Sequence, residues 1–357
     1  MLKQHFDVDS IHSIIFYELK AVPFLQYILA AFLCRYFDHG RCAYRSGAGS
    51  ELAQLLVLID NLSLVRYLVL LNNTSNGASF VFASEGIKSI ISTIVNHVFE
   101  FSNVSAYRNG TLVFDGLDLS IRKGENTAIL GPNGSGKTTL MKLISREIYP
   151  VWSERSRMLV YGRDQWNVEE LRSRLGIVSH DLQQNYGSHA KGRDVILSGY
   201  YSSIDIWPHQ LFSAAEIGRV EELMRRLGIE ELADRPFGKM STGQQRRFLL
   251  GRALVHRPEA LLLDEPTSGL DITASFHYLD KARRLMQQGT QLILVTHHIH
   301  EIPPEITRVI FMRKGRIVAD GDKEAILTSS GVSSLFDCGV ELIERHGFYL
   351  PVPASEL

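Results

Sequence analysis

A regular alternation of apolar and polar positions begins near Val98. Residues 98–107 and 111–121 both follow this two-residue period, and Asn109-Gly110 lies between them as a two-residue turn favoured in hairpins. Alternation of this kind is typical of half-buried antiparallel strands. The pattern therefore predicts an antiparallel β-ribbon over residues 98–121.

A second pattern consists of short, almost continuously apolar segments separated by helical stretches. These segments span residues 127–130, 175–179, 260–263 and 292–295. Parallel strands covered by helices on both faces show this pattern, so the core is predicted to be α/β with a mostly parallel sheet. The first segment runs into a glycine-rich loop and then a helix with Leu140, Leu143 and Ile144 at helical spacing. A hairpin over residues 309–320 and a short helix over 322–328 are expected at the end.

Between the second and third apolar segments the pattern becomes helical. Ser213 and Glu216 have the spacing of a capping box, in which each side chain accepts a hydrogen bond from the other residue's backbone N–H. Apolar residues recur at helical spacing from Ile217 to Leu227, and Gly228 is suited to end that helix. We expect a helical subdomain over about residues 183–256.

The first 95 residues differ from the rest of the chain. Residues 1–100 carry 15 charged side chains, against 62 in the remaining 257 residues, and their apolar runs keep no sustained period. Residues 72–79 are rich in Asn, Ser and Gly and are predicted to form a loop. Two interpretations of residues 1–95 stay open: a small helical extension, or an upstream sequence that is not native or is poorly ordered, which the abrupt start of the pattern slightly favours.

Composition excludes several classes of protein. Lys and Arg total 38 against 39 Asp and Glu, a balance that does not fit a general binder of nucleic acid. Cys34, Cys42 and Cys338 have no metal-ligand spacing and are too few for a disulfide scaffold. The longest apolar run, residues 21–34, is short of the roughly 20 residues that a transmembrane helix needs, and acidic residues stand where a secretory leader is positive. A cytoplasmic protein is expected.

Residues 131–138 read Gly-Pro-Asn-Gly-Ser-Gly-Lys-Thr and lie between a predicted strand and a predicted helix. This is the phosphate-loop pattern in the context that it requires. Glycines leave backbone N–H groups free to surround phosphates, and the start of the helix adds partial positive charge. Lys137 would reach the terminal phosphates and the Thr138 hydroxyl would ligate magnesium. An ordinary glycine turn is the alternative, but it does not explain the flanking strand and helix.

A later apolar strand ends in two carboxylates, Asp264 and Glu265. In phosphate-loop enzymes the first carboxylate holds the magnesium shell, and the second can polarise an attacking water at the carboxyl end of the strand. A helix N-cap would explain one acidic residue, but not both after an apolar strand. The pair therefore predicts a magnesium ligand at Asp264 and, at Glu265, a catalytic carboxylate that polarises water.

From about residue 98 to 328 the chain resembles the nucleotide-binding subunit of an ATP-binding cassette (ABC) transporter. Residues 240–244, Met-Ser-Thr-Gly-Gln, resemble the family signature but depart from it at the Met and at the Thr. Residues 268–271 resemble the dimer-contact loop, and His297 holds the position of the switch histidine. Each of these taken alone also reads as a helix cap, a polar turn or a structural histidine. The resemblance implies a P-loop NTPase fold of ABC type, with a mostly parallel sheet core, an antiparallel β subdomain and a helical subdomain.

The resemblance also implies the roles of individual residues. Catalytic roles fall on Lys137, Glu265 and His297, and magnesium on Thr138 and Asp264. Tyr107 matches the aromatic residue that stacks on adenine, with a half-buried strand tyrosine as the alternative. Further nucleotide contacts are expected at Gly131, Pro132, Asn133, Gly134, Ser135, Gly136, Thr139, Ser241, Gly243, Gln244 and Asp271. The implied cofactors are ATP and Mg²⁺.

One position departs from the family pattern. The family usually has a glutamine directly after the strand at residues 175–179, where this sequence has His180 followed by Gln183 and Gln184. The magnesium-linked sensor is therefore expected at His180, or at Gln183 or Gln184 in an altered loop.

The implied function is an ATP-binding and ATP-hydrolysing subunit that energises solute transport by separate transmembrane subunits. Residues 96–330 would form the ABC domain and residues 331–357 a C-terminal tail. The chain is expected to act as a homodimer or as a heterodimer with a similar subunit, peripherally on the inner face of the cell membrane. The alternative is a non-transport ABC ATPase of DNA repair or ribosomes, whose usual coiled coil or second module the sequence does not show. A regulator that binds but does not hydrolyse nucleotide would be expected to lack Glu265 or His297.

Overall fold

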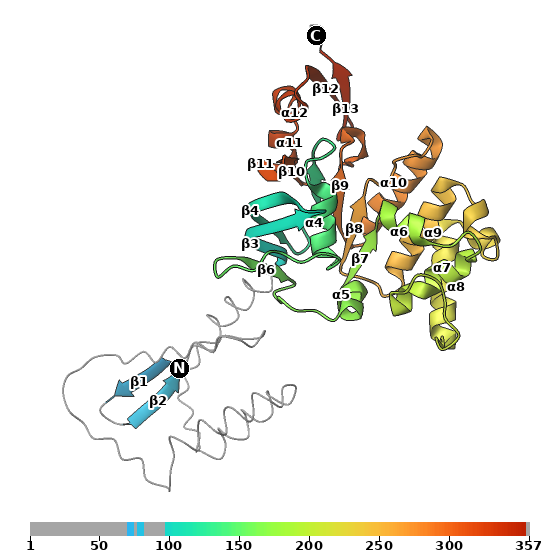
Figure 1. The fold of residues 1–357 in the computed structure, drawn as a ribbon, viewed down its shortest axis with the longest axis horizontal. Helices are drawn as coiled ribbons and strands as arrows, with labels where there is room; N and C mark the ends of the chain where they lie inside the picture. The colour runs from blue at the N-terminus through green and yellow to red at the C-terminus, as the bar shows by residue number, and fades with distance from the viewer. Residues whose placement is uncertain (1–69, 75–76, 82–96, 355–357) are drawn as a thin grey trace, which may run out of the picture. The chain divides into compact units, whose positions relative to one another are not determined.

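The computed structural model describes residues 70–74, 77–81 and 97–354 (Figure 1). Residues 70–81 belong to a different compact unit from residues 97–354. Within that first unit, β1 (Leu70–Thr74) and β2 (Gly77–Val81) pair as antiparallel strands. The loop predicted over residues 72–79 is therefore wrong, because backbone pairing in a two-stranded ribbon does not require apolar side chains. The other predictions for residues 1–95 lie outside the described residues.

A six-stranded sheet forms the centre of residues 97–354. Its order is β11-β10-β5-β9-β8-β7, and all neighbouring pairs are parallel except β10 with β11. The strands are β5 (Thr127–Leu130), β7 (Leu175–Val178), β8 (Ala260–Asp264), β9 (Gln291–Thr296), β10 (Arg308–Arg313) and β11 (Arg316–Asp322). The short apolar segments of the sequence are thus the buried parallel strands, as predicted.

The sheet has a core on each face because successive side chains of a strand point to opposite sides. Leu262 of β8 packs in the core that contains the β-ribbon and α4 (Lys137–Ile144). Its neighbours Leu261 and Leu263 pack in the other core, with the helical elements. The ribbon comprises β3 (His97–Arg108), β4 (Thr111–Arg122) and β6 (Arg157–Val160), and the predicted hairpin turn at Asn109-Gly110 is confirmed. In Figure 1 the ribbon lies on the left of the sheet and the helical elements on the right.

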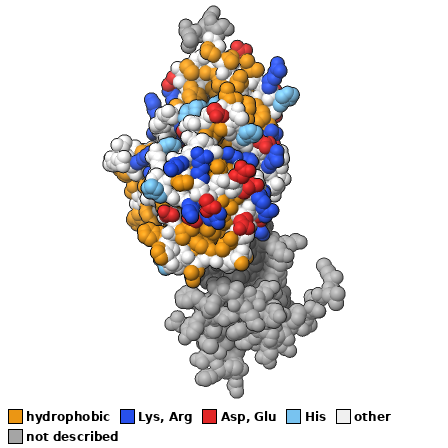
Figure 2. Space-filling view, turned by 90° about the vertical axis from the view of Figure 1, so that its right-hand side faces the viewer, with side chains coloured by type: hydrophobic (Ala, Val, Ile, Leu, Met, Phe, Trp, Pro, Cys, Tyr) orange, Lys and Arg blue, Asp and Glu red, His pale blue; other side chains and the backbone are white. Residues whose placement is uncertain are grey.

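Most helices follow β6 and β7. These are α5 (Val168–Arg174), α6 (His180–Asn185), α7 (Gly192–Leu197), α8 (Ala214–Leu227), α9 (Thr242–Leu254) and, after β8, α10 (Ile272–Gln287). The predicted capping box of Ser213 and Glu216 begins α8, and Gly228 ends it in the left-handed conformation. Figure 2 shows this side of the molecule, where Lys, Arg, Asp and Glu side chains are interspersed. No helix among the described ranges is long and apolar enough to cross a bilayer.

The C-terminal part folds against the segment that follows β9. The elements are η4 (Ile299–Glu301), α11 (Lys323–Ile326), α12 (Ser329–Phe336) and the hairpin β12 (Val340–Arg345) with β13 (Phe348–Pro353). Strand β13 packs on η4. The buried Lys323 ammonium donates to the carbonyls of Pro303, Pro304 and Gly347, and so holds the hairpin turn on this segment.

Candidate active site at the ends of the central strands

The phosphate loop joins β5 to α4, and its shape depends on glycine. A Cβ atom on Gly131 would lie 2.1 Å from the Met312 carbonyl oxygen, so no side chain fits there. Gly134 and Gly136 have φ angles of +78° and +111°, which L-residues rarely adopt. The loop ends at the N-terminus of α4, whose first N–H groups have no acceptor within the helix. The predicted glycine-rich loop between a strand and a helix is therefore present, and the binding of phosphate by its N–H groups stays a prediction.

Lys137 is the first residue of α4 and is almost fully buried. Its ammonium donates to the carbonyl oxygens of Gly131 at 2.7 Å and Pro132 at 3.0 Å. Burial lowers the pKa of Lys137, while the nearby carboxylates of Glu265 and Asp264 act in the opposite direction. The structure thus brings the lysine close to both acidic residues.

Four other predicted loop residues lie around this lysine. Thr139 is buried in the first turn of α4, and Thr138 before it is half-buried. The hydroxyl of Ser135 is buried and has no hydrogen-bond partner among the described residues. Asn133 is exposed at the tip of the loop. These positions surround the N-terminal end of α4, as a phosphate site requires.

The two carboxylates stand where β8 ends. Asp264 is the last residue of β8, and Glu265 follows in the left-handed conformation with φ of 44°. The Glu265 N–H donates to the Val295 carbonyl at 2.8 Å, which ties this turn to β9. Burial, and then the charge of Glu265, raise the pKa of Asp264 to about 6. A buried carboxyl group whose ionisation is opposed in this way, next to a second acidic residue, fits a site for a divalent cation.

A metal site here needs more than protein ligands. Among residues 97–354 no group of three His, Cys, Asp or Glu side chains is arranged to hold a metal ion. Mg²⁺ typically takes only one or two carboxylates and completes its shell with water and substrate phosphates. The lack of a three-ligand group among the described residues is therefore compatible with the predicted magnesium ligands, Asp264 and Thr138.

His297 directly follows β9, the strand next to β8. Its Nδ1 atom lies 2.7 Å from Oε1 of Glu265, and both side chains are about one-quarter exposed. The ring of His298 lies close against it, with 3.8 Å between ring centroids. The parallel register thus places a carboxylate and an imidazole side by side, at the edge of the sheet where Lys137 also lies. Such a pair is suited to orient a water molecule and to handle its proton.

The signature-like residues lie elsewhere in the helical part. Ser241 caps α9: its hydroxyl accepts from the Gln244 N–H at 3.3 Å, and the Gln244 amide oxygen accepts from the Ser241 N–H at 3.0 Å. Gly243 packs against Ala274 of α10. Asp271 caps α10, because its carboxylate accepts from the Ala274 N–H at 2.7 Å. Within residues 97–354 no hydrogen bond joins Ser241, Gly243, Gln244 or Asp271 to the phosphate loop.

Tyr107 lies near the end of β3 with about half of its surface exposed. It pairs with Leu112 of β4, and the next pair along the ribbon is Ala106 with Phe114. The Phe114 ring in turn lies over Gly136 of the phosphate loop, where an added Cβ atom would come within 2.9 Å of it. The backbone next to Tyr107 thus runs close to the phosphate loop, and stacking of its exposed ring on adenine stays a prediction.

Comparison with known proteins places these features in one family. A profile of the ABC transporter family matches residues 114–268. The hemin import ATP-binding protein HmuV of Photobacterium damsela subsp. piscicida is 30% identical over 269 residues, which cover 73% of this chain and 98% of that protein. The chain belongs to the ABC transporter family. It is the ATP-binding subunit of such a transporter, an ATPase that energises transport through membrane subunits.

Two further matches agree with this assignment. The cobalt import ATP-binding protein CbiO of Rhodobacter capsulatus is 33% identical over 229 residues, or 62% of this ABC subunit and 78% of that protein. The solved structure of cbiO1 from Clostridium perfringens, part of the ABC transporter complex cbiONQ, has a TM-score of 0.55 at 28% identity and covers 67% of this chain and 94% of that one. The predicted fold, an ABC-type P-loop NTPase with a mixed sheet and an antiparallel subdomain, is confirmed.

The loop after β7 is where this ABC subunit departs from the family pattern. His180 is the first residue of α6 and is exposed. The Gln183 amide instead donates to Oε1 of Gln245 on α9 at 2.6 Å, and Gln184 is exposed. Asp181 forms an ion pair with Lys142 of α4 at 2.8 Å and adds to the negative charge around Asp264.

Arg246 is a site residue that the sequence reasoning missed. It is 1% exposed, and its guanidinium donates to the carbonyl oxygens of Glu265 at 2.6 Å and Ser268 at 3.1 Å. It therefore holds the turn in which Glu265 adopts its left-handed conformation. The sequence does contain a signal for it: Arg246 has helical spacing to the apolar Leu249, Leu250 and Ala253, which places a charged residue on the buried face of α9.

Proposed function

We propose that ATP hydrolysis by this subunit is carried by Glu265, His297 and Lys137. The observation that supports this most directly is the 2.7 Å contact between Glu265 Oε1 and His297 Nδ1, beside the lysine of the phosphate loop. Glu265 accepts a hydrogen bond from water and directs its oxygen at the γ-phosphorus. The bond between the γ-phosphorus and the bridging oxygen breaks, ADP leaves, and the proton of the attacking water passes to the phosphate product.

Lys137 and His297 support this step from two sides. The Lys137 ammonium neutralises charge on the β- and γ-phosphate oxygens, and the N–H groups at the start of α4 add to this effect. His297 is held by Glu265 and hydrogen-bonds the γ-phosphate. When bound, Mg²⁺ neutralises the β- and γ-phosphates, and Asp264 and Thr138 are the residues that would hold it. Tyr107 stacks on the adenine.

A second chain would complete the site. Ser241, Gly243 and Gln244 lie at the start of α9, where the capping box uses the N–H groups of Ser241 and Gln244, and the Gly243 N–H has no acceptor within the helix. Among the described residues they form no hydrogen bond with the phosphate loop of their own chain. We infer that they close over the γ-phosphate bound by a partner copy, with Asp271 in the contact between the two chains. A homodimer satisfies this with one kind of chain, and a similar ATPase subunit would form the equivalent heterodimer.

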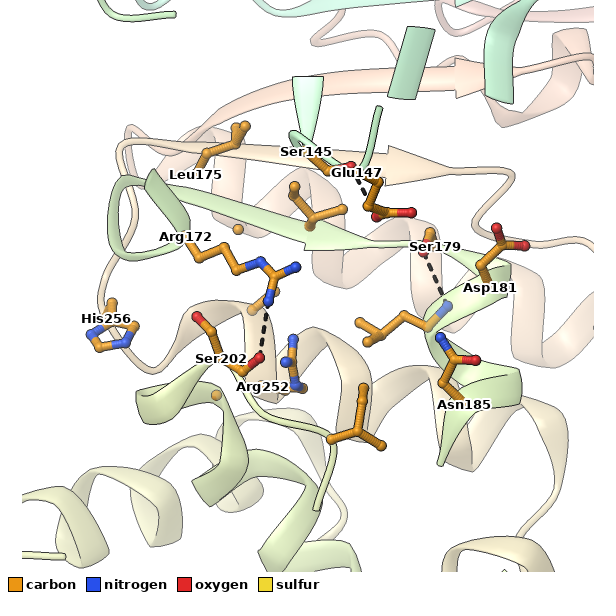
Figure 3. A pocket seen from close by; sticks show the side chains of 16 residues that line it. Ser145, Glu147, Arg172, Leu175, Ser179, Asp181, Asn185, Ser202, Arg252 and His256 are labelled. Carbon is orange, nitrogen blue, oxygen red and sulfur yellow. Dashed lines mark hydrogen bonds between the residues drawn. The ribbon is translucent and has the colours of Figure 1, made fainter. Parts of the chain in front are cut away.

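A cavity beside the loop after β7 is the proposed docking site for the membrane subunit. Its volume is about 330 Å³, and its lining includes Arg172, Arg252, Asp181, Asn185 and His256 (Figure 3). Arg252 is over nine-tenths buried, and its Nε atom has no partner in the described part of the chain. An acidic side chain of a helical segment would pair with these guanidinium groups. The subunit would then sit peripherally on the inner, cytoplasmic face of the membrane.

The direction of transport is proposed from the relatives. Proteins named for hemin import and cobalt import are 30% and 33% identical to this chain over most of its ABC region. We infer an importer. The solute itself is selected by the membrane subunits and any solute-binding protein that act with this subunit.

The experiment that tests the catalytic assignment is steady-state hydrolysis of Mg-ATP by the full chain. Lys137→Ala should abolish turnover, because it removes a charge that stabilises the transition state by several kcal/mol in such sites. Lys123→Ala is the matched control, since Lys123 pairs with Glu259 away from the phosphate loop and should keep the parent rate. Turnover retained by Lys137→Ala would refute the assignment.

A further inference from the structure

Glu301 is a buried carboxylate with no assigned role. It ends η4, four residues after His297, and it is 0% exposed. Among residues 97–354 no Lys, Arg or His forms an ion pair with it. An unpaired buried carboxylate is costly unless hydrogen bonds replace the lost water.

The hydrogen bonds of Glu301 all come from the turns that carry the proposed catalytic pair. The Thr267 N–H donates to Oε1 at 2.9 Å, and the Thr267 hydroxyl bonds the same oxygen. The Thr296 hydroxyl bonds Oε2. Thr267 lies two residues after Glu265, and Thr296 lies directly before His297. One side chain therefore joins the turn after β8 to the turn after β9.

Thr296 extends this connection. Its hydroxyl oxygen accepts from the His298 N–H at 2.8 Å, which fixes the backbone around His297. Its carbonyl accepts from the Gly131 N–H at 3.2 Å, at the start of the phosphate loop. A shift of Thr296 would consequently move the histidine turn against both Glu265 and the phosphate loop.

We propose that Glu301 is a positioning residue, which sets the contact between Glu265 and His297 by holding Thr267 and Thr296 on its two oxygens. This rests on the proposed function only in taking Glu265 and His297 as the pair that acts. Glu301 touches neither nucleotide nor water in the reaction. Its removal should lower the rate of hydrolysis while leaving the binding of ATP, which depends on the phosphate loop and the ribbon, nearly unchanged.

The first test is the turnover of Glu301→Gln in the full chain. The amide presents one acceptor oxygen in place of two, so one turn is released. The value of kcat should fall at least about tenfold while KM for ATP stays within about twofold, because misplacing a reacting group affects mainly the chemical step. Glu305→Gln is the matched control: Glu305 lies in the same segment but pairs with Arg283, and its variant should keep the parent kcat. Equal losses in both variants, or none in Glu301→Gln, would overturn the proposal.

Hydrogen exchange supplies a readout that does not depend on turnover. In Glu301→Gln the amides of residues 264–271 should exchange at least about tenfold faster than in the parent, since the bond from the Thr267 N–H is weakened. Unchanged exchange would overturn the positioning role. A parent protein without ATPase activity would instead refute the proposed function and leave the exchange result standing. If Glu301→Gln does not fold, Thr296→Val, which removes one donor from the cluster, decides in its place: an unchanged kcat and unchanged exchange would overturn the proposal.

Discussion

At the scale of single residues, the fold disfavours the charged forms of some side chains in the site. Asp264 is a clear case, since its burial and the neighbouring Glu265 raise its pKa to about 6 from an ordinary 3.8. The unfolded chain releases this proton near pH 4, but the folded protein keeps it to about pH 6. This contribution to stability is therefore present at low pH and is lost as the pH rises from about 4 to about 6. The ionised form of Asp264, which a magnesium ligand needs at neutral pH, therefore lowers the free energy of unfolding.

We predict that Asp264→Asn stabilises the metal-free protein at pH 7.5, by roughly 1–3 kcal/mol, because the amide carries no charge to bury. At pH 5 the carboxyl of the parent is protonated and the difference should shrink. Denaturant unfolding with a chelator present measures both values. Asp280→Asn, at an exposed position paired with Arg284, is the control and should change stability by less than about 0.5 kcal/mol. A destabilised Asp264→Asn at pH 7.5 would refute the electrostatic account.

The candidate catalytic and magnesium-binding residues could be predicted from the sequence, but the buried residues that hold them in place could not. Asp264 ends a strand, Glu265 and His297 directly follow one, and Lys137 comes after the loop that follows β5, so short local patterns in the sequence predict all four. Arg246 and Glu301 act on partners 19 and 34 residues away, which no local period brings together. The left-handed conformation of Glu265 is likewise set by bonds to Val295 and Arg246 and not by its own sequence.

At the scale of elements, the loop between β7 and α6 is the place where this subunit differs from its family. Strand β7 pairs in parallel with β8, so the loop begins next to Asp264. The sequence predicts the parallel strands correctly because each is a short apolar run. It also predicts α8, because the capping box and the final glycine are local signals. The side-chain partners within the loop after β7 were not predictable, because Gln183 bonds to α9 and Asp181 to α4.

We predict that His180 serves as the magnesium-linked sensor, because it holds the position of the family glutamine directly after β7. His180→Ala should lower turnover at least about tenfold, and His180→Gln should keep it within about threefold, since the amide restores a hydrogen-bonding group. Lys123→Ala, a change away from this loop, is the control and should leave turnover unchanged. Full activity in His180→Ala together with a loss in Gln183→Ala would transfer the role to Gln183.

At the scale of the whole molecule, residues 97–354 contain every residue of the proposed site. We predict that deletion of residues 1–95 leaves the ATPase rate within about twofold of the parent, because the strands and loops described around the site all lie within residues 97–354. Steady-state hydrolysis measures this. An inactive or insoluble truncated protein would show that residues 1–95 belong to the functional fold.

Deletion of residues 338–357 provides the contrast. It removes the hairpin of β12 and β13, of which β13 packs on η4, and the Gly347 carbonyl in the hairpin turn, which accepts from the Lys323 ammonium. Because η4 carries Glu301, the C-terminal deletion should lower turnover or solubility where the N-terminal deletion does not. If both truncated proteins kept the turnover and solubility of the parent, the stabilising role assigned to the hairpin would be contradicted.

The central claim is that Glu265 directs hydrolysis in a site shared by two chains. Glu265→Gln should keep ATP binding, because the phosphate loop and Lys137 are intact, and should release no phosphate. The bound nucleotide then holds two copies together. Light scattering on a sizing column in saturating Mg-ATP should give the mass of a dimer for this variant, with ATP recovered uncleaved from the peak. A monomer under these conditions, or phosphate release at the rate of the parent, would contradict the account.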